Sequence, residues 1–274
     1  MVSITFERVG PMKTDIRRKG ALRLAPCTYG LSKLRFRGPM RPTDGRFIAF
    51  LGGSDTFAKY IRQPFPDLIE TATGEVCVDL GCQSAGPDVF LQDMAVHSLC
   101  HDASGVVLQV IGATNLSNAF YKVHPRRNDR FVAPTDKLTA LFPEIDFTEI
   151  AFTGHLIARL RGVDEARFDL VKQHLQRTWL RRMKTLIGQC TGPVVLLWLR
   201  GPSDDEAPAF ITRDMVNTLK DLATKLVELE TQTGVTDGMC FAPLDAVNAA
   251  QALSVDAHIK AAKALRKPIM QAIT

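Results

Sequence analysis

Five short apolar runs, separated by longer amphipathic segments, constrain the fold of this 274-residue chain more than any other feature. Four of the five are continuous or nearly so, which is typical of strands covered on both faces of a parallel sheet. The runs are residues 47–51 (FIAFL), 76–80 (VCVDL), 106–111 (VVLQVI), 194–199 (VVLLWL) and 239–242 (MCFA). We expect these five runs to form one sheet.

The intervals between the runs carry helical periodicity. Residues 164–188 space their apolar side chains three and four apart, and residues 212–232 repeat the pattern. Residues 88–100 and 257–272 also predict helices. Strands that alternate with helices indicate βαβ units and an α/β fold, a doubly wound three-layer sandwich with a mainly parallel five-stranded sheet. Residues 112–163 show no such order, and long irregular stretches often serve function.

Charge divides the chain at about residue 46. Residues 1–46 hold 11 Lys+Arg against 3 Asp+Glu, whereas the remainder holds 23 against 26. We predict a basic irregular N-terminal extension over 1–46, packed on the body through Tyr29, Leu34 and Phe36, and a single α/β domain over 47–274. Such a basic segment suits an anionic small molecule or an acidic partner. Nucleic acid is an unlikely ligand, because no basic stripe is interleaved with aromatic residues.

The sequence shows no sign of membrane insertion, cofactor or metal. No apolar run approaches about 18 residues, and the N-terminus lacks the apolar region of a secretory signal. We therefore expect a cytoplasmic protein with reduced cysteines. Phosphate-binding glycine motifs are absent, which predicts no nucleotide cofactor. His97 and His101 have helical metal-ligand spacing but no evident third ligand, so we expect no metal.

The first strand end raises the question of a nucleophile. Gly52 and Gly53 permit a tight turn into a helix, and Ser54 follows at the helix N-terminus. In a parallel α/β sheet, ligands bind beyond the carboxyl ends of the strands. Ser54 is therefore either a nucleophile at such an end or the residue that caps the next helix.

Later strand ends carry further polar candidates. Gly86 follows the second strand and is suited to bring a backbone N–H close to a ligand. Asn115 follows the third strand, where its amide either faces the same crevice or bonds its own loop. His258 opens the last helix, where it is either a solvated or capping residue or the base that Ser54 requires.

The order Ser, Gly, Asn, His at successive strand ends resembles the SGNH (GDSL-like) hydrolase family, which implies a flavodoxin-like sandwich. The resemblance implies that Ser54 attacks an acyl carbonyl and that His258, oriented by Asp256, takes its proton. It also implies an oxyanion hole made of the N–H groups of Ser54 and Gly86 and the Asn115 side chain, each donor being worth about 2.7–4 kcal/mol in the transition state.

Three motifs depart from the pattern of that family. The usual Gly-Asp-Ser is Gly-Gly-Ser54, and the usual Gly-x-Asn-Asp becomes Gly112-Ala-Thr-Asn115. The usual Asp-x-x-His is one residue shorter, Asp256-Ala-His258. A serine–histidine dyad or a non-catalytic relative of the family are therefore open alternatives.

A second resemblance covers nearly the whole chain. The phrases YGLSKLRFRGP (29–39), FLGGSDTF (50–57), DLGCQSAGPDVFL (79–91), QVIGATNLSNAFYKVHPRRNDRF (109–131) and IDFTE (145–149) are similar to an alphaproteobacterial family known only as a domain of unknown function. This resemblance implies one domain of this length and no particular activity.

A basic loop follows the third strand end. It contains His124, Arg126, Arg127, Asn128 and Arg130, a combination that suits phosphate, sulfate or carboxylate. The extension offers further cations in SKLRFR, namely Lys33, Arg35 and Arg37. The alternative is that the loop arginines pair with nearby acids, Asp129, Asp146 and Glu149, and only hold the loop together.

Three functions remain open at this point. The first is an SGNH-like serine hydrolase or acyltransferase that acts on an ester with an anionic group. The second is a non-catalytic protein that binds an anionic ligand or partner on the same fold. The third, transfer of a sulfuryl or phosphoryl group, lacks a visible nucleotide-donor loop.

Overall fold

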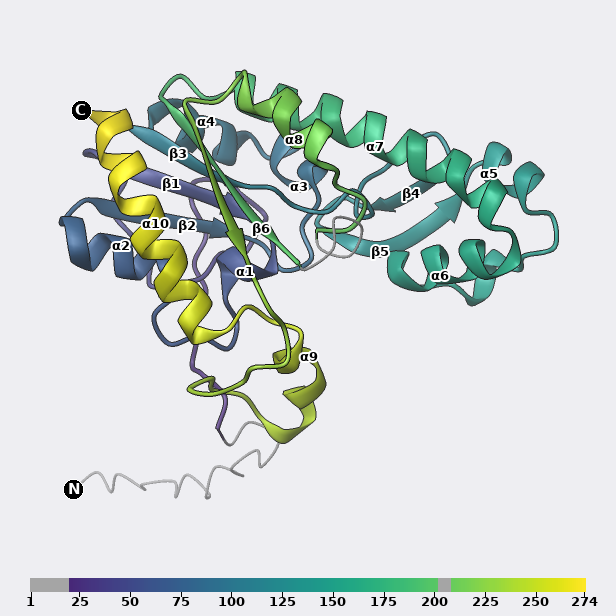
Figure 1. Cartoon of the computed structure of the whole chain (residues 1–274), viewed down its shortest axis with the longest axis horizontal. Helices are drawn as coiled ribbons and strands as arrows, with labels where there is room; N and C mark the ends of the chain where they lie inside the picture. The colour runs from purple at the N-terminus through teal and green to yellow at the C-terminus, as the bar shows by residue number, and fades with distance from the viewer. Residues whose placement is uncertain (1–19, 202–207) are drawn as a thin grey trace, which may run out of the picture.

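The computed structural model describes residues 20–201 and 208–274, and it is built around one parallel five-stranded sheet (Figure 1). The strands lie in the order β2-β1-β3-β6-β7, and every neighbouring pair is parallel. Their bounds are β1 Phe47–Gly52, β2 Val76–Gly81, β3 Gly105–Gln109, β6 Val194–Arg200 and β7 Lys225–Glu230.

Helices cover both faces of this sheet, which completes the expected three-layer α/β sandwich (Figure 1). One face carries α2 (Phe65–Thr73) and α10 (Val255–Ile273). The other face carries α3 (Pro87–Leu91), α4 (Met94–Asp102), α7 (Glu165–Gly188) and α8 (Arg213–Lys220).

The continuous apolar runs make strands because each strand buries both of its faces. In β1, Ala49 and Leu51 pack into one hydrophobic core, whereas Ile48 and Phe50 pack into the other. All six residues of β1 are buried. Four of the five predicted strands are thereby confirmed, with ends that differ by a residue or two.

The fifth predicted strand and the helix before it are wrong. The helix predicted over 212–232 ends at Lys220, and residues 225–230 form β7, with Leu226 paired to Leu196 of β6. Residues 239–242 lie outside any strand. The helix was predicted too long because the leucines of β7 happen to continue the helical spacing of α8. The strand was missed because β7, at the edge of the sheet, buries too few side chains to be continuously apolar.

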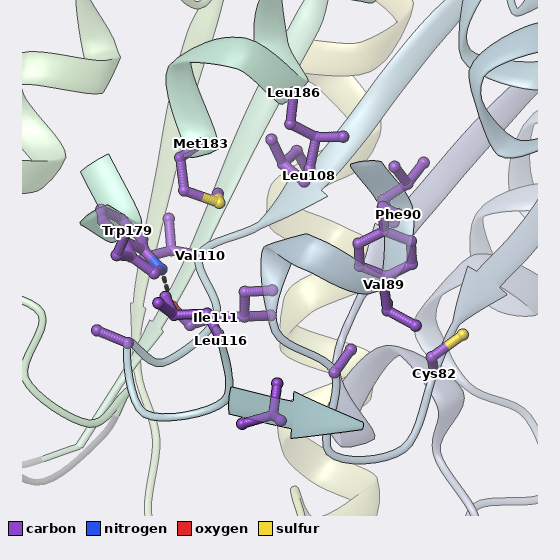
Figure 2. Close-up of a cluster of buried hydrophobic side chains, with 14 of the residues drawn as sticks. Cys82, Val89, Phe90, Leu108, Val110, Ile111, Leu116, Trp179, Met183 and Leu186 are labelled. Carbon is purple, nitrogen blue, oxygen red and sulfur yellow. Dashed lines mark hydrogen bonds between the residues drawn. The ribbon is translucent and has the colours of Figure 1, made fainter. Parts of the chain in front are cut away.

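The apolar stripe of α7 packs on the sheet as predicted (Figure 2). Trp179 is fully buried there, and its indole N–H donates to the carbonyl oxygen of Ile111 over 2.8 Å. This bond ties the centre of the longest helix to the end of β3. The region beyond β3 is therefore held in a fixed position.

The stretch 112–163 contains more regular structure than we expected. It forms an antiparallel hairpin, β4 (Tyr121–His124) with β5 (Arg127–Pro134), followed by α5 (Asp136–Leu141), the short 3₁₀ helix η2 (Phe147–Glu149) and α6 (Thr153–Val163). The predicted helix 88–100 is instead two helices. They are separated at Asp93, whose side chain accepts from the N–H groups of Ala95 and Val96.

The described part of the extension, residues 20–46, belongs to the same core. Tyr29, Leu34 and Phe36 are buried as predicted, and Cys27 forms an antiparallel bridge with Phe36. A further segment between β7 and α10 carries η3 (Pro243–Asp245) and α9 (Ala246–Ala250), and α9 projects beneath the sheet (Figure 1). In the described ranges, no helix is both long and apolar enough to cross a membrane.

Candidate functional site

A pocket of about 870 Å³ opens beyond the carboxyl ends of β1 and β2. Four parts of the chain line it: the extension, the turn after β1 with the loop after β2, the tip of the β4–β5 hairpin, and α9 with the residues after it. This is the edge of a parallel α/β sheet at which ligands bind. Its volume lies within the range of small-molecule sites, roughly 300–1,000 Å³.

Ser54 lines this pocket as an exposed residue, the first of the short helix α1 (Ser54–Phe57). The helix cap is Gly53, and no side chain caps the helix, so the capping interpretation of Ser54 is wrong. The Ser54 Oγ instead accepts a hydrogen bond of 3.0 Å from the backbone N–H of Ser84. The hydroxyl proton of Ser54 is therefore free to point elsewhere.

Gln109, at the end of β3, holds the turn that presents Ser54. Its side-chain oxygen accepts from the Gly53 N–H over 2.9 Å and from the Thr56 hydroxyl over 2.7 Å. Its amide nitrogen donates to the Asp55 carboxylate over 2.9 Å. A Cβ at Gly52 would lie 2.4 Å from the Gln109 oxygen, so this arrangement requires glycine there.

Ser84 has a left-handed backbone, with φ of 53°, although it is not a glycine. Its carbonyl oxygen accepts from the Asn115 side-chain amide over 3.0 Å. The Asn115 oxygen in turn accepts from the Thr153 hydroxyl over 2.6 Å. Such strained residues cluster at functional sites and persist only where the surroundings hold them. Asn115 thus supports the loop beside Ser54 instead of pointing a free amide into the pocket.

Gly86 also has its donor occupied. Its N–H donates to the Asn128 side-chain oxygen over 3.1 Å, and a Cβ at this position would lie 1.5 Å from the Asn115 carbonyl oxygen. Of the three donors expected to form an oxyanion hole, Gly86 and Asn115 are therefore bonded within the protein in this state.

The structure does not bring His258 into the pocket. The ring lies on the α2 side of the sheet, 1% exposed, and stacks on Phe65 with ring centroids 5.6 Å apart. Its Nδ1 accepts from the Phe65 N–H over 3.2 Å, and its Nε2 is buried with no hydrogen-bond partner among the described residues. Burial, with a smaller contribution from the Arg37 charge, lowers the pKa of His258 to about 3. Its position inside α10 makes it a core residue.

Asp256 likewise lies away from Ser54 and does not orient the His258 ring. It is an exposed residue that pairs with Lys260, four residues later on α10, over 2.7 Å. Asp256 and His258 are two residues apart on the α10 helix, so their side chains point to different sides of it.

The hairpin tip brings His124, Arg126 and Arg127 to the pocket wall. Arg127 pairs with Asp129 over 3.3 Å, whereas no acidic partner of Arg126 occurs among the described residues. Asn128 is buried and holds the tip, because its oxygen accepts from the N–H groups of Gly86 and Val89. It positions the hairpin and does not itself line the pocket.

Two of the predicted cations are used elsewhere. Arg130 stacks on Phe152, with its guanidinium carbon 4.1 Å from the ring centroid. Arg37 is buried, and its guanidinium donates to the carbonyl oxygens of Ala58 and Ile61 over 2.7 Å each. It anchors the extension against the segment after α1.

The extension also supplies Lys33 and Arg35 to the pocket. Sequence reasoning missed further polar lining residues, among them Asp55, Lys59, Asn248 and Gln251. Asp55 and Lys59 follow Ser54 closely, which was an available signal. Nothing in the sequence pointed to Asn248 and Gln251, because α9 reaches the pocket only through tertiary structure.

Burial raises the pKa of the Asp55 carboxyl, although the Gln109 amide and a Leu253 backbone hydrogen bond oppose this shift. Within residues 20–201 and 208–274, no cluster of three or more His, Cys, Asp or Glu could hold a metal ion. The pocket therefore combines the exposed Ser54 hydroxyl, the carboxyl groups of Asp55 and Asp129, and several cations.

Comparison with known proteins identifies a family and a distant likeness. A family model described as a domain of unknown function (DUF6473) matches residues 12–273. No curated protein matches the chain. The chain is 12% identical to a carbohydrate esterase family 2 enzyme of Corynascus thermopiles (Myceliophthora fergusii), with a TM-score of 0.45 over 86% of this chain and 69% of that chain.

A family two carbohydrate esterase from Clostridium thermocellum, solved with cellohexaose, gives 12% identity and a TM-score of 0.44 over 86% of this chain and 66% of that chain. Likeness at this level supports no assignment of chemistry to the pocket. The pocket's own residues have to carry any functional argument.

Proposed function

Because the chain belongs to the DUF6473 family, whose description names no activity, we propose a function from the site alone: the pocket beside Ser54 binds an anionic small molecule. The observation that carries this proposal is the excess of positive charge on the pocket lining. Its cations are Lys33, Arg35, Lys59, Arg126 and Arg127, and its acids are Asp55 and Asp129.

Acidic residues of the protein form ion pairs with only some of these cations. Lys59 pairs with Asp245 over 3.1 Å, and Arg127 pairs with Asp129. Lys33, Arg35 and Arg126 have no acidic partner among the described residues. Like charges gathered in a concave surface focus a positive potential and attract anions. Arginine forks also bind carboxylate and phosphate groups bidentately.

His124 adds a hydrogen-bond donor to the pocket lining. Its Nδ1 accepts from the Arg126 N–H over 3.2 Å. In the neutral ring the proton therefore sits on Nε2, which makes that atom a donor and not a base. A donor beside Arg126 favours an anion over a proton-transfer role.

Anion binding is tested by thermal unfolding with sulfate and with inorganic phosphate. We expect saturating phosphate to raise the melting temperature by several degrees, since ligand at a hundred times Kd stabilises by about 2.7 kcal/mol. Arg126→Ala combined with Arg127→Ala should reduce the shift, whereas Ser54→Ala should retain it in full. The matched control removes two exposed cations of α10 through Arg266→Ala and Lys267→Ala, and should behave as the wild type. An equal shift in both double variants would contradict the proposal.

A second candidate is an SGNH-like serine hydrolase or acyltransferase acting on an ester of such an anion. It is favoured by the exposed Ser54 hydroxyl in the pocket and by the Ser84 N–H, which would stabilise a developing alkoxide. Ser54 Oγ would bond to the acyl carbon while the ester C–O bond breaks and the alcohol leaves with the proton. Water or an acceptor alcohol would then release the acyl group.

This candidate requires a base that the present arrangement keeps apart. For His258 to take the Ser54 proton, Phe65 would have to withdraw from the ring and free Nδ1. A fluorophosphonate probe tests the point directly. Labelling of Ser54 that disappears in His258→Ala establishes the hydrolase, whereas an unlabelled, folded protein that still binds phosphate establishes the binding function alone.

A further inference from the structure

We propose that the ligand of this pocket carries two separate anionic groups, one held by Arg126 at the hairpin tip and the other by Lys33 and Arg35 of the extension. This inference rests on the proposed anion-binding function. It specifies the class of ligand, because the two cationic points of the pocket stand on different parts of the chain, the hairpin tip and the extension.

The first cationic point, Arg126, stands on a rigid support. The hairpin tip is fixed to the start of α3 by Asn128, whose oxygen accepts from the Gly86 N–H over 3.1 Å and the Val89 N–H over 3.2 Å. Its amide nitrogen donates to the His124 carbonyl oxygen over 3.0 Å. Arg126 is thus presented by a preorganised turn, with the His124 donor beside it.

The second group has its own, independent support. Lys33 and Arg35 are exposed residues on either side of the buried Leu34. The Ser32 hydroxyl donates to the Asp93 carboxylate over 2.7 Å and fixes the segment to the start of α4. The extension therefore brings its cations to the pocket without any contribution from the hairpin.

The rest of the pocket disfavours a third anionic group. Lys59 is already paired with Asp245, and Asn248 and Gln251 are neutral. Asp55 adds a carboxyl group, whose ionised form would repel an anion placed against it. A ligand that fits has two negative groups for the cationic points and neutral polar atoms for Asn248 and Gln251. The volume of about 870 Å³ has room for such a molecule.

Alkyl bisphosphonates and alkyl monophosphonates of matched length test this inference by isothermal titration calorimetry at 150 mM salt. A symmetric bisphosphonate has about twice the affinity of its monophosphonate for statistical reasons alone. Two linked groups that bind two sites at once raise the affinity far more, but only where the spacer is long enough to join the two sites. We expect one spacer length to bind the wild type at least about tenfold more tightly than its monophosphonate.

Lys33→Ala with Arg35→Ala should bring the bisphosphonate to within about twofold of the monophosphonate, because only the hairpin then holds an anionic group. The control pair Arg266→Ala and Lys267→Ala should keep the full advantage. Equal binding of both ligands to the wild type, or an advantage that survives without Lys33 and Arg35, would overturn the inference. If no phosphonate binds at all, the proposed function itself fails, so the two failures are distinguishable.

Discussion

The pH dependence of stability should report on His258 as a core residue. The folded chain lowers the pKa of His258 from 6.5 to about 3, chiefly by burying the ring. Between these two values the unfolded chain holds one more proton than the folded chain. The free energy of unfolding therefore has its full value, as far as His258 is concerned, above pH 6.5, and it decreases as the pH falls toward 3.

The size of this effect follows from the shift. Each pKa unit corresponds to about 1.4 kcal/mol, so the whole window amounts to about 4–5 kcal/mol, with about 2 kcal/mol already lost at pH 5. That is a large part of the 5–15 kcal/mol typical of folded domains. His258→Gln removes the titration, together with the ring that stacks on Phe65 and accepts its N–H. The variant should be less stable than the wild type at pH 7.5, and the gap should narrow by about 2 kcal/mol at pH 5.

Urea unfolding of both proteins at pH 7.5, 6 and 5 measures this gap. Groups common to the two chains cancel in the difference, including Asp79, whose raised pKa gives the opposite slope. A ring titration followed by NMR supplies the pKa directly. A gap that stays constant with pH, or a His258 that titrates near 6.5, would refute the burial argument and reopen the ring as a candidate base for Ser54.

Three further predictions concern single positions. Burial raises the pKa of Asp79 from 3.8 to about 7, so the cost of burying its ionised carboxylate appears as the pH rises through this window. Asp79→Asn should therefore stabilise the protein by about 4 kcal/mol at pH 8, and urea unfolding at pH 4 should show no such gain. Asn128→Ala removes the acceptor of two N–H groups and should lower the free energy of unfolding in urea by about 3 kcal/mol. A decrease below about 1 kcal/mol would contradict the role of Asn128 as the support of the hairpin. Gly86→Ala places a Cβ 1.5 Å from the Asn115 carbonyl oxygen and should lower the melting temperature sharply. The control Gly45→Ala, which has open space around its Cβ, should not lower it. Equal melting temperatures of the two variants would contradict the close approach at Gly86.

The sequence was most informative where burial was complete. Runs such as FIAFL in β1 and VVLLWL in β6 are apolar throughout because both faces are covered, and no helix of a half-exposed layer has that pattern. β7 was missed for the opposite reason. It lies at the sheet edge with only Val227 fully buried, so its polar residues left a pattern that also fits a helix.

The site was only partly predictable, because sequence spacing does not say which atoms face one another. The position of Ser54 at a strand end followed from the two glycines before it. Whether His258 reaches it depends on which side of α10 faces the sheet, a tertiary property. In the same way, Asn115 and Asn128 had the residue type of ligand-binding amides, yet the backbone around them takes up their hydrogen bonds.

The buried arginine of the extension separates the stability of this segment from the chemistry that it presents to the pocket. Because Arg37 and the apolar anchors Leu34 and Phe36 hold the segment in place, the exposed positions 33 and 35 between and beside them are free to change without loss of the fold. Substitutions at these two positions would therefore change part of the pocket wall while the sheet stays intact. Under the proposed function, the ligand preference of this protein is set in part by a segment that belongs to none of its strands.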